Sequence, residues 1–202
     1  MRFKNLRKNK IDYLYFFLYN SNMNLSDNYI AGLVDGEGCF YIGISKRRCS
    51  TVGFLIRPCF RLLLVKKSEK LLRRIKDRMG VGMVNIKKSN NINHQDQVYY
   101  EVGGLKDCQK LRVFFENKLN IKKRDFGLWC KCLNIMETYE QFTIDGVLKI
   151  ARIRDRMNKT ARKKQGRYRN VRTIRKEIEK HQKFKLTKRI QHNVLDFLDL
   201  WF

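Results

Sequence analysis

Residues 30–38 read Ile-Ala-Gly-Leu-Val-Asp-Gly-Glu-Gly, and this stretch decides the fold. Side chains that can cap a helix precede it, so the sequence predicts a helix over 26–36. A glycine inside a helix costs roughly 1 kcal/mol relative to Ala. Gly32 and Gly36 nevertheless follow Asn28 at intervals of four, which leaves one ridge of the helix almost without side chains. A second helix could approach that ridge closely.

Two carboxylates, Asp35 and Glu37, stand at the end of the predicted helix. The helix dipole disfavours negative charge at a C-terminus, and residues that are locally unfavourable often mark a functional site. An ordinary helix followed by a glycine turn is the alternative interpretation of these residues. The carboxylates are therefore candidate functional groups.

The spacing of apolar residues changes from helical to alternating after Gly38, and it predicts an α+β fold with a four-stranded antiparallel sheet. Each of two hairpins is flanked by helices, in the order helix-strand-strand-helix-strand-strand-helix. The expected elements after the first helix are a strand through Phe40, Ile42 and Ile44, a strand over 52–65, a helix over 68–79, strands over 81–88 and 97–102, helices over 105–119, 126–140 and 143–157, and a last amphipathic segment over 186–202.

One face of this sheet should pack on the helices and the other should stay open. Side chains alternate along a strand, so Phe40, Ile42 and Ile44 should face the core and the residues between them should lie on the open face. A polar, basic and aromatic strand ribbon can enter a DNA major groove; a solvated sheet face is the alternative. The residues proposed to contact DNA are Tyr41, Ser45, Arg47, Arg61, Asn85, Lys87, Tyr99 and Glu101.

The composition favours a nucleic-acid partner. The 202 residues include 45 Lys and Arg against 19 Asp and Glu, a net charge of +26, and 43% are hydrophobic, enough for a folded core. No apolar run approaches the roughly 18 residues of a membrane span, so no membrane partner is expected. The six Cys form no C-x-x-C pair, which indicates reduced intracellular thiols. Only three Ala and one Pro, with abundant Lys, Asn and Ile, suggest an AT-rich mitochondrial or plastid gene.

Residues 30–38 closely resemble the nine-residue signature of the LAGLIDADG homing endonucleases. The resemblance extends over about 25–160 and includes Gly80-Val81-Gly82, the helix start at 105–108, the stretch 122–129 and residues 146–158. It implies three regions, namely a basic N-terminal extension (1–24), an endonuclease domain (25–160) whose sheet forms a DNA-binding saddle, and a basic C-terminal extension with a terminal helix (161–202).

The resemblance also assigns roles to particular residues. Glu37 matches the acidic residue that binds catalytic Mg²⁺, or another divalent cation such as Mn²⁺, with the Gly36 carbonyl as a further ligand. Asp35 is expected to make structural hydrogen bonds. Lys122 matches the catalytic lysine, with its neighbour Lys123 as a rival. Lys67, or alternatively Lys66, at the end of the second strand, would supply a further basic or water-positioning group; a solvated strand end is the alternative interpretation.

The sequence contains a single signature, whereas cutting both DNA strands needs two acidic sites. The resemblance therefore implies a homodimer through Asn28, Gly32 and Gly36, which makes a double-strand break in a nearly palindromic DNA target. Such enzymes are encoded in introns and promote intron homing. Two alternatives stay open, an intron RNA splicing maturase with the same fold and a non-catalytic DNA-binding regulator.

Overall fold

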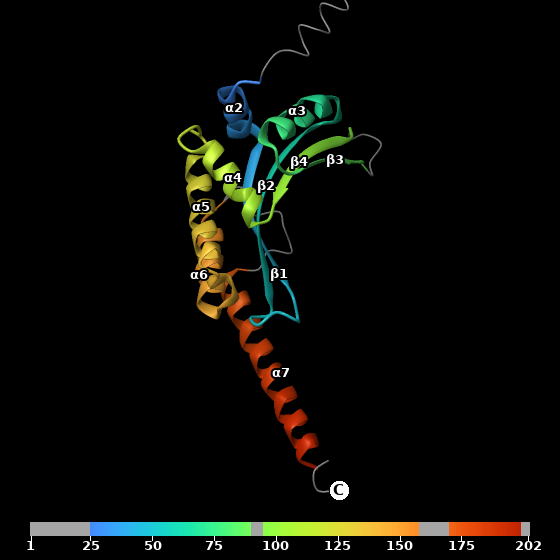
Figure 1. Ribbon diagram of the computed structural model, residues 1–202, viewed down its shortest axis with the longest axis vertical. Coiled ribbons are helices and arrows are strands. Elements are labelled where there is room, and N and C mark those ends of the chain that lie inside the picture. Colours follow the sequence, from blue (N-terminus) through green and yellow to red (C-terminus); the bar gives the residue numbers. More distant parts are fainter. Residues whose placement is uncertain (1–24, 90–94, 158–169, 199–202) are drawn as a thin grey trace, which may run out of the picture.

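The computed structural model describes residues 25–89, 95–157 and 170–198, with side chains as far as residue 187. The order of helices and strands confirms the predicted α+β fold (Figure 1). The elements are α2 (Asp27–Glu37), β1 (Gly38–Lys46), β2 (Phe54–Val65), η1 (Lys66–Ser68), α3 (Glu69–Met79), β3 (Met83–Lys87), β4 (Gln97–Gly103), α4 (Leu105–Phe115), α5 (Lys123–Glu137), η2 (Glu140–Phe142), α6 (Ile144–Arg154) and α7 (Val171–Leu198).

The four strands form one antiparallel sheet in the order β1-β2-β4-β3. Figure 1 shows the sheet bending from the long β1–β2 hairpin toward the shorter β3–β4 hairpin, with α4, α5 and α6 beside β1 and β2 and α3 above β3 and β4. All of these helices cover the same face. The other face carries no helix in the described part of the chain, as the alternating pattern predicts.

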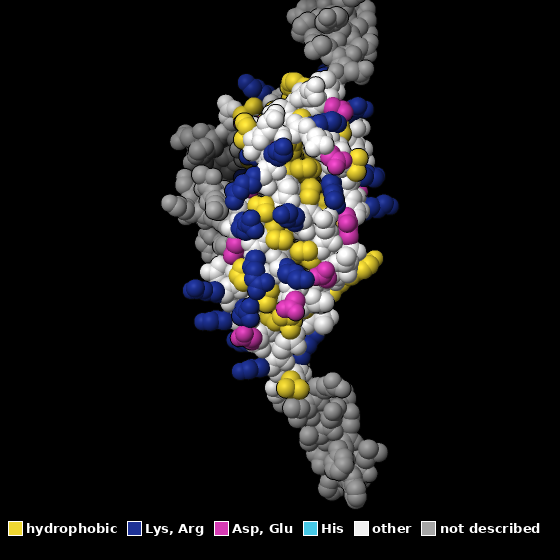
Figure 2. Space-filling model, turned by 90° about the vertical axis from the view of Figure 1, so that its left-hand side faces the viewer, with side chains coloured by type: hydrophobic (Ala, Val, Ile, Leu, Met, Phe, Trp, Pro, Cys, Tyr) yellow, Lys and Arg dark blue, Asp and Glu magenta, His cyan; other side chains and the backbone are white. Residues whose placement is uncertain are grey.

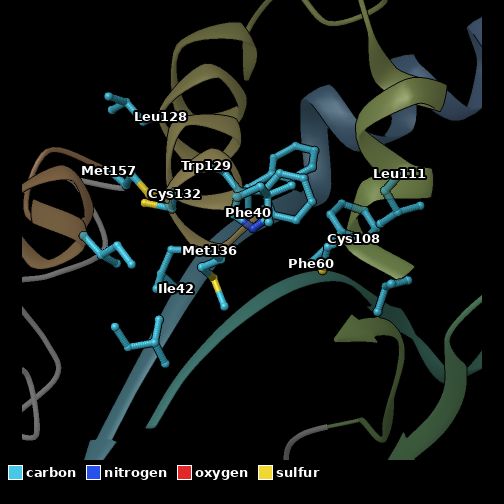
Figure 3. Close-up of a cluster of buried hydrophobic side chains, with 14 of the residues drawn as sticks. Phe40, Ile42, Phe60, Cys108, Leu111, Leu128, Trp129, Cys132, Met136 and Met157 are labelled. Carbon is cyan, nitrogen blue, oxygen red and sulfur yellow. The ribbon is translucent and has the colours of Figure 1, made fainter. Parts of the chain in front are cut away.

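The core lies between the sheet and the helices, and aromatic rings fill its centre (Figure 3). The Phe40 ring on β1 lies 5.0 Å from that of Phe60 and 5.2 Å from that of Trp129, measured between centroids. Each fully buried aromatic or aliphatic side chain contributes about 1.5–3 kcal/mol. Because Phe40 follows the signature stretch by two residues, this packing fixes the end of α2 relative to the sheet.

The helix boundaries differ from the prediction by up to three residues, and by more than that at two places. The helix α4 ends at Phe115 rather than near Leu119, because Asn117 takes a positive φ of 56° that breaks the helix. The C-terminal helix begins at Val171 rather than near Leu186, and its first turns bury Ile174 and Ile178 in the core.

The structure describes only part of the three predicted regions. Residues 1–24 and 158–169 lie outside the described part, so both expected boundaries stay predictions. The buried Ile174 and Ile178 show that part of the expected C-terminal extension packs on the domain. None of the described helices is long and apolar enough to cross a membrane.

Candidate functional site

The signature stretch forms α2 and the first residue of β1. The Ser26 side chain caps the helix by accepting a hydrogen bond from the Tyr29 amide at 3.2 Å. The inward face buries Ile30 and Val34. Gly38 is required by its surroundings, since a Cβ atom there would lie 2.6 Å from the Val34 carbonyl oxygen.

The helix α2 is fastened at both ends by acidic side chains. The buried Asp35 carboxylate accepts hydrogen bonds from the backbone amides of Asn120 (2.8 Å) and Lys122 (2.9 Å). At the other end, Asp27 contacts Lys118 and Arg78 at 3.0 Å each, and the hydrogen bond from Lys118 lowers the pKa of its carboxyl. Asp35 thus has the structural contacts expected of it, and α2 presents a fixed outer face.

The outer face of α2 is the ridge of small residues. Gly32 and Gly36 are exposed, and a Cβ atom built on either would meet no atom within 4 Å. Asn28 is exposed beside them, and the Tyr29 side chain is 49% exposed. Packing within this chain therefore gives no reason for either glycine.

Glu37 is the last residue of α2 and is exposed. Among the described residues, its carboxylate has no hydrogen bond or ion pair. No group of three or more His, Cys, Asp or Glu that could hold a metal ion occurs in the described ranges. At the exposed end of α2, the oxygen ligands that one chain offers a cation are the Glu37 carboxylate and the carbonyl of Gly36 in the last turn of the helix.

Lys122 lies close to this end of α2. Its backbone amide is bound by Asp35, and its ammonium acts on the thiol of Cys39, the second residue of β1. Desolvation raises the pKa of that thiol, and the positive charge of Lys122 opposes this. Lys122 is half-buried and precedes α5, whereas Lys123 is exposed. The choice of Lys122 over Lys123 as the catalytic lysine stays a prediction.

The second pair of candidate lysines follows β2 in the short helix η1. The Lys66 ammonium forms an ion pair with Asp96 at 3.2 Å, whereas Lys67 is exposed and makes no ion pair with the described residues. Gly38 pairs with Leu62, and Val65 lies about 10 Å further along the strand. Both lysines are therefore further from Glu37 than the β2 residue that pairs with Gly38.

The cross-strand register places the predicted contact residues of the strands on one face. Cys39 pairs with Arg61 and Arg61 with Glu101, while Tyr99 pairs with Asn85. Because the pairing is in phase, every second residue joins this face, which we call the open face. Its residues are Cys39, Tyr41, Gly43 and Ser45 on β1, Leu55, Arg57, Cys59, Arg61, Leu63 and Val65 on β2, Gln97, Tyr99, Glu101 and Gly103 on β4, and Met83, Asn85 and Lys87 on β3.

Arg61 is held in one orientation at the centre of the open face. Its Nε donates to Glu101 Oε2 at 2.6 Å, and its Nη2 contacts the same oxygen. The guanidinium carbon lies 4.8 Å from the ring centroid of Tyr99 and 5.9 Å from that of Tyr41. Burial raises the pKa of the Tyr41 hydroxyl, which therefore stays neutral. The arginine is ordered before any ligand binds.

The helical side of the molecule is also rich in charge. Figure 2 shows Lys and Arg side chains spread over that side, with Asp, Glu and hydrophobic side chains between them. The excess of positive charge is therefore not confined to the open face. What distinguishes the open face is its set of ordered polar and aromatic side chains.

Comparison with known proteins assigns the fold to a family. A family model described as "LAGLIDADG endonuclease" matches residues 30–133, just over half of the chain. The crystal structure of the homing endonuclease I-TnaI matches with a TM-score of 0.65 and 31% identity, over 77% of this chain and 99% of that one. The chain belongs to the LAGLIDADG endonuclease family.

Other proteins that this LAGLIDADG chain resembles are longer. I-CpaMI, solved bound to uncleaved DNA, matches at 28% identity and a TM-score of 0.61, over 67% of this chain but 44% of its own. A probable intron-encoded endonuclease of Neurospora crassa is 27% identical over 71% of this chain and 26% of its own length. A cox1 intron-2 protein of Schizosaccharomyces pombe is 29% identical over 65% and 38%. The chain spans between a quarter and two fifths of these two curated relatives.

Two predicted site residues of this LAGLIDADG chain lie just beyond the ends of strands. Arg47 follows the last residue of β1, and its amide donates to the Gly53 carbonyl at 2.8 Å, which continues the β1–β2 register by one pair at the start of the turn. Lys67 is in η1, which directly follows β2. One residue was missed: Arg57 is exposed on the open face opposite Gly43. Its spacing of four residues from Arg61 is the signal that would have found it.

Proposed function

We propose that this protein is a site-specific DNA endonuclease that acts as a homodimer and cuts a long, nearly palindromic target in a metal-dependent reaction. The observation that carries the proposal is the unpaired Glu37 carboxylate at the end of a helix whose outer ridge is bare, beside the open face of the sheet. Cleavage of the intron-minus allele of the host gene, with and without Mg²⁺, tests it. Binding without cleavage would instead favour the DNA-binding regulator.

The bare ridge supports dimerisation through α2. Two such ridges could pack backbone against backbone, as small residues permit, and the twofold axis would bring both Glu37 residues together. The sizes of the relatives are consistent with this arrangement. The chain matches nearly all of I-TnaI but less than half of I-CpaMI, so that two copies would supply a unit of the size of the longer chain.

The residues at the end of α2 fit a hard divalent cation. Mg²⁺ is usually bound by one or two carboxylates and keeps several waters, and Glu37 with the Gly36 carbonyl offers oxygen ligands only. When bound, such an ion would polarise a phosphoryl oxygen and activate water. Lys122 would stabilise negative charge on the phosphate from its position beside the same helix end. Lys67 would position water only if the bound DNA brings the reacting phosphate toward η1.

The open face supports direct reading of bases. Since Glu101 takes Nε and one Nη2 hydrogen of Arg61, the opposite edge of the guanidinium remains for an external acceptor. That edge can bind the O6 and N7 atoms of a guanine in a major groove. Arg61 pairs with Cys39, two residues after Glu37. The guanine is therefore expected near the centre of the target.

Replacing Arg61 by Ala should cost about 1–3 kcal/mol of discrimination at one pair of symmetry-related base pairs. Arg57→Ala removes the same charge from the same face and should leave preference at those positions unchanged. A competition titration against single-base-pair variants of the target measures both. If Arg61→Ala instead binds all target variants more weakly by the same factor, Arg61 contacts a phosphate and does not read a base.

The same titration separates the endonuclease from the maturase. A-form RNA has a deep, narrow major groove that side chains cannot read, so binding of Arg61→Ala to the folded intron transcript should match wild type. If the substitution weakens RNA binding and spares DNA preference, the sheet serves RNA and the maturase is the better interpretation.

The helix α7 carries a basic stripe on the side away from the protein. Arg172, Lys176, Lys180 and Lys183 are all exposed and share one helical face. We propose that they bind DNA phosphates. Changing all four to Gln should make the fall of log K with log salt less steep, where K is the association constant for DNA. The slope should change by up to about 0.9 for each phosphate that is no longer bound, and base preference should be retained. An unchanged slope would identify the stripe as a solvated surface.

The relatives support an origin in an intron. Two of them are named for the introns that encode them, ND4 intron 1 in Podospora anserina and cox1 intron 2 in Schizosaccharomyces pombe. We propose that this chain is likewise encoded in an intron of an organellar gene and promotes the spread of that intron.

A further inference from the structure

The turn between β1 and β2, residues 47–53, lies against α7 although about 130 residues separate them in sequence. Figure 1 shows α7 passing the end of the β1–β2 hairpin and continuing beyond it. His181 and Gln182 meet the backbone of the turn, not its side chains. We call this set of contacts the turn clamp.

The turn clamp centres on two neighbouring carbonyl groups. The Ser50 carbonyl oxygen lies 3.1 Å from His181 Nε2 and accepts a hydrogen bond from Lys185 Nζ at 3.1 Å. The Thr51 carbonyl accepts from Gln182 Nε2 at 3.2 Å.

The packing between the turn and the helix is close. Gly53 has a φ of 77°, and a Cβ atom there would lie 2.8 Å from Cγ of His181. At the edge of the turn, Lys46 pairs with Glu177 at 2.7 Å. A backbone held at these points cannot move independently of α7.

The clamp acts on Arg47, the proposed base-reading residue of the turn. The Ser50 amide and hydroxyl both donate to the Arg47 carbonyl, at 3.1 and 3.0 Å, and the Ser50 carbonyl is the acceptor for α7. Arg47 Nε is in turn held by Cys49 Sγ at 3.2 Å. A side chain that reads a base must be held to within about 0.5 Å by its supporting residues.

We infer that α7 positions the β1–β2 turn for DNA recognition, with His181 and Gln182 as positioning residues for Arg47. This inference rests on the proposed endonuclease function. The turn lies at the far end of β1 from Glu37, so that the base pairs it reads are the outermost ones of each half-site. Selectivity at those base pairs therefore depends on α7, and selectivity near the centre does not.

Two variants of the full-length chain test the clamp. His181→Ala combined with Gln182→Ala removes both of these side-chain contacts with the turn, whereas His181→Gln retains an amide that can donate to the Ser50 carbonyl. Glu179→Gln, an exposed position on the opposite side of the same helix, is the matched control. The first readout needs no DNA: it is the rate of trypsin cleavage after Arg47 and Arg48, followed by mass spectrometry.

The double variant should be cut in the turn about tenfold faster than wild type, because it lacks two of the hydrogen bonds that close the turn. His181→Gln and the control should be cut at the wild-type rate. Equal rates for the double variant and wild type would overturn the clamp, whatever the protein does to DNA.

The second readout is base preference on a duplex that spans the intron insertion point. The double variant should lose about tenfold in discrimination at the outermost symmetry-related base pairs and keep it at the centre, with His181→Gln close to wild type. Faster trypsin cleavage with unchanged outer preference would overturn the role in recognition. Failure of the wild-type protein to prefer this duplex would refute the proposed function, and the trypsin result would still decide the clamp.

Discussion

Glu37→Gln should abolish DNA cleavage and leave specific binding nearly intact. The amide keeps the volume of the side chain and removes the negative charge of the exposed carboxylate at the end of α2. Metal stabilisation of a phosphoryl transition state is worth several kcal/mol, and about 1.4 kcal/mol corresponds to a factor of ten in rate. We therefore expect cleavage to slow by a factor of about 100 or more.

The matched control for this variant is Glu179→Gln. Glu179 is an exposed residue of α7, and its substitution raises the net charge by the same amount. Any gain in DNA affinity from the added charge should therefore be common to both variants. Cleavage of a labelled duplex in Mg²⁺ and binding without divalent cations are the two measurements. If Glu37→Gln cuts within tenfold of wild type, Glu37 does not bind the metal ion.

The sheet could be predicted from the sequence because its side-chain period is exact. Once Phe40, Ile42 and Ile44 were assigned to the core, the register brought Tyr41, Arg61 and every other predicted strand residue to the opposite face. Arg47 shows where that logic stops. The alternation was extended one residue past the end of β1 at Lys46, where the side chain and carbonyl of Arg47 are held by residues of the turn, Cys49 and Ser50.

The start of α7 could not be predicted, because two buried isoleucines stand among many charges. Ile174 and Ile178 are four residues apart and mark a buried face, but the basic residues around them resemble a solvated segment. The turn clamp is even harder to recognise in the sequence. A contact between side chains and backbone carbonyl groups requires no particular residue in the turn, so Ser50 and Thr51 carry no pattern that points to α7.

Contacts within one chain explain some residues of the signature helix and leave others without an explanation. The hydrogen bonds of Asp35 to a loop more than 80 residues away explain its carboxylate, and the close Val34 carbonyl explains Gly38. Gly32 and Gly36 have no such explanation within one chain. The strongest test of the homodimer therefore acts on these glycines.

Gly32→Leu should separate the subunits without harming the fold of either one. A side chain at this position meets no atom within 4 Å in the single chain, and Leu favours a helix over Gly by about 0.8–1 kcal/mol. An isolated subunit should therefore be as stable as wild type or slightly more so. In a backbone-to-backbone helix crossing, by contrast, the added volume cannot be accommodated. Light scattering should give the mass of one 24.3 kDa chain.

Gly127→Leu is the matched control, because Gly127 is also an exposed helical glycine, on α5, and a Cβ atom added to it would meet no atom within 4 Å. It should gain the same helix propensity and remain a dimer that cuts DNA. Gly32→Leu should lose double-strand cleavage together with dimerisation, since each chain supplies one Glu37. A wild-type protein with the mass of a single chain that still cuts both strands would exclude the homodimer. A Gly32→Leu protein that stays dimeric would move the interface to another face.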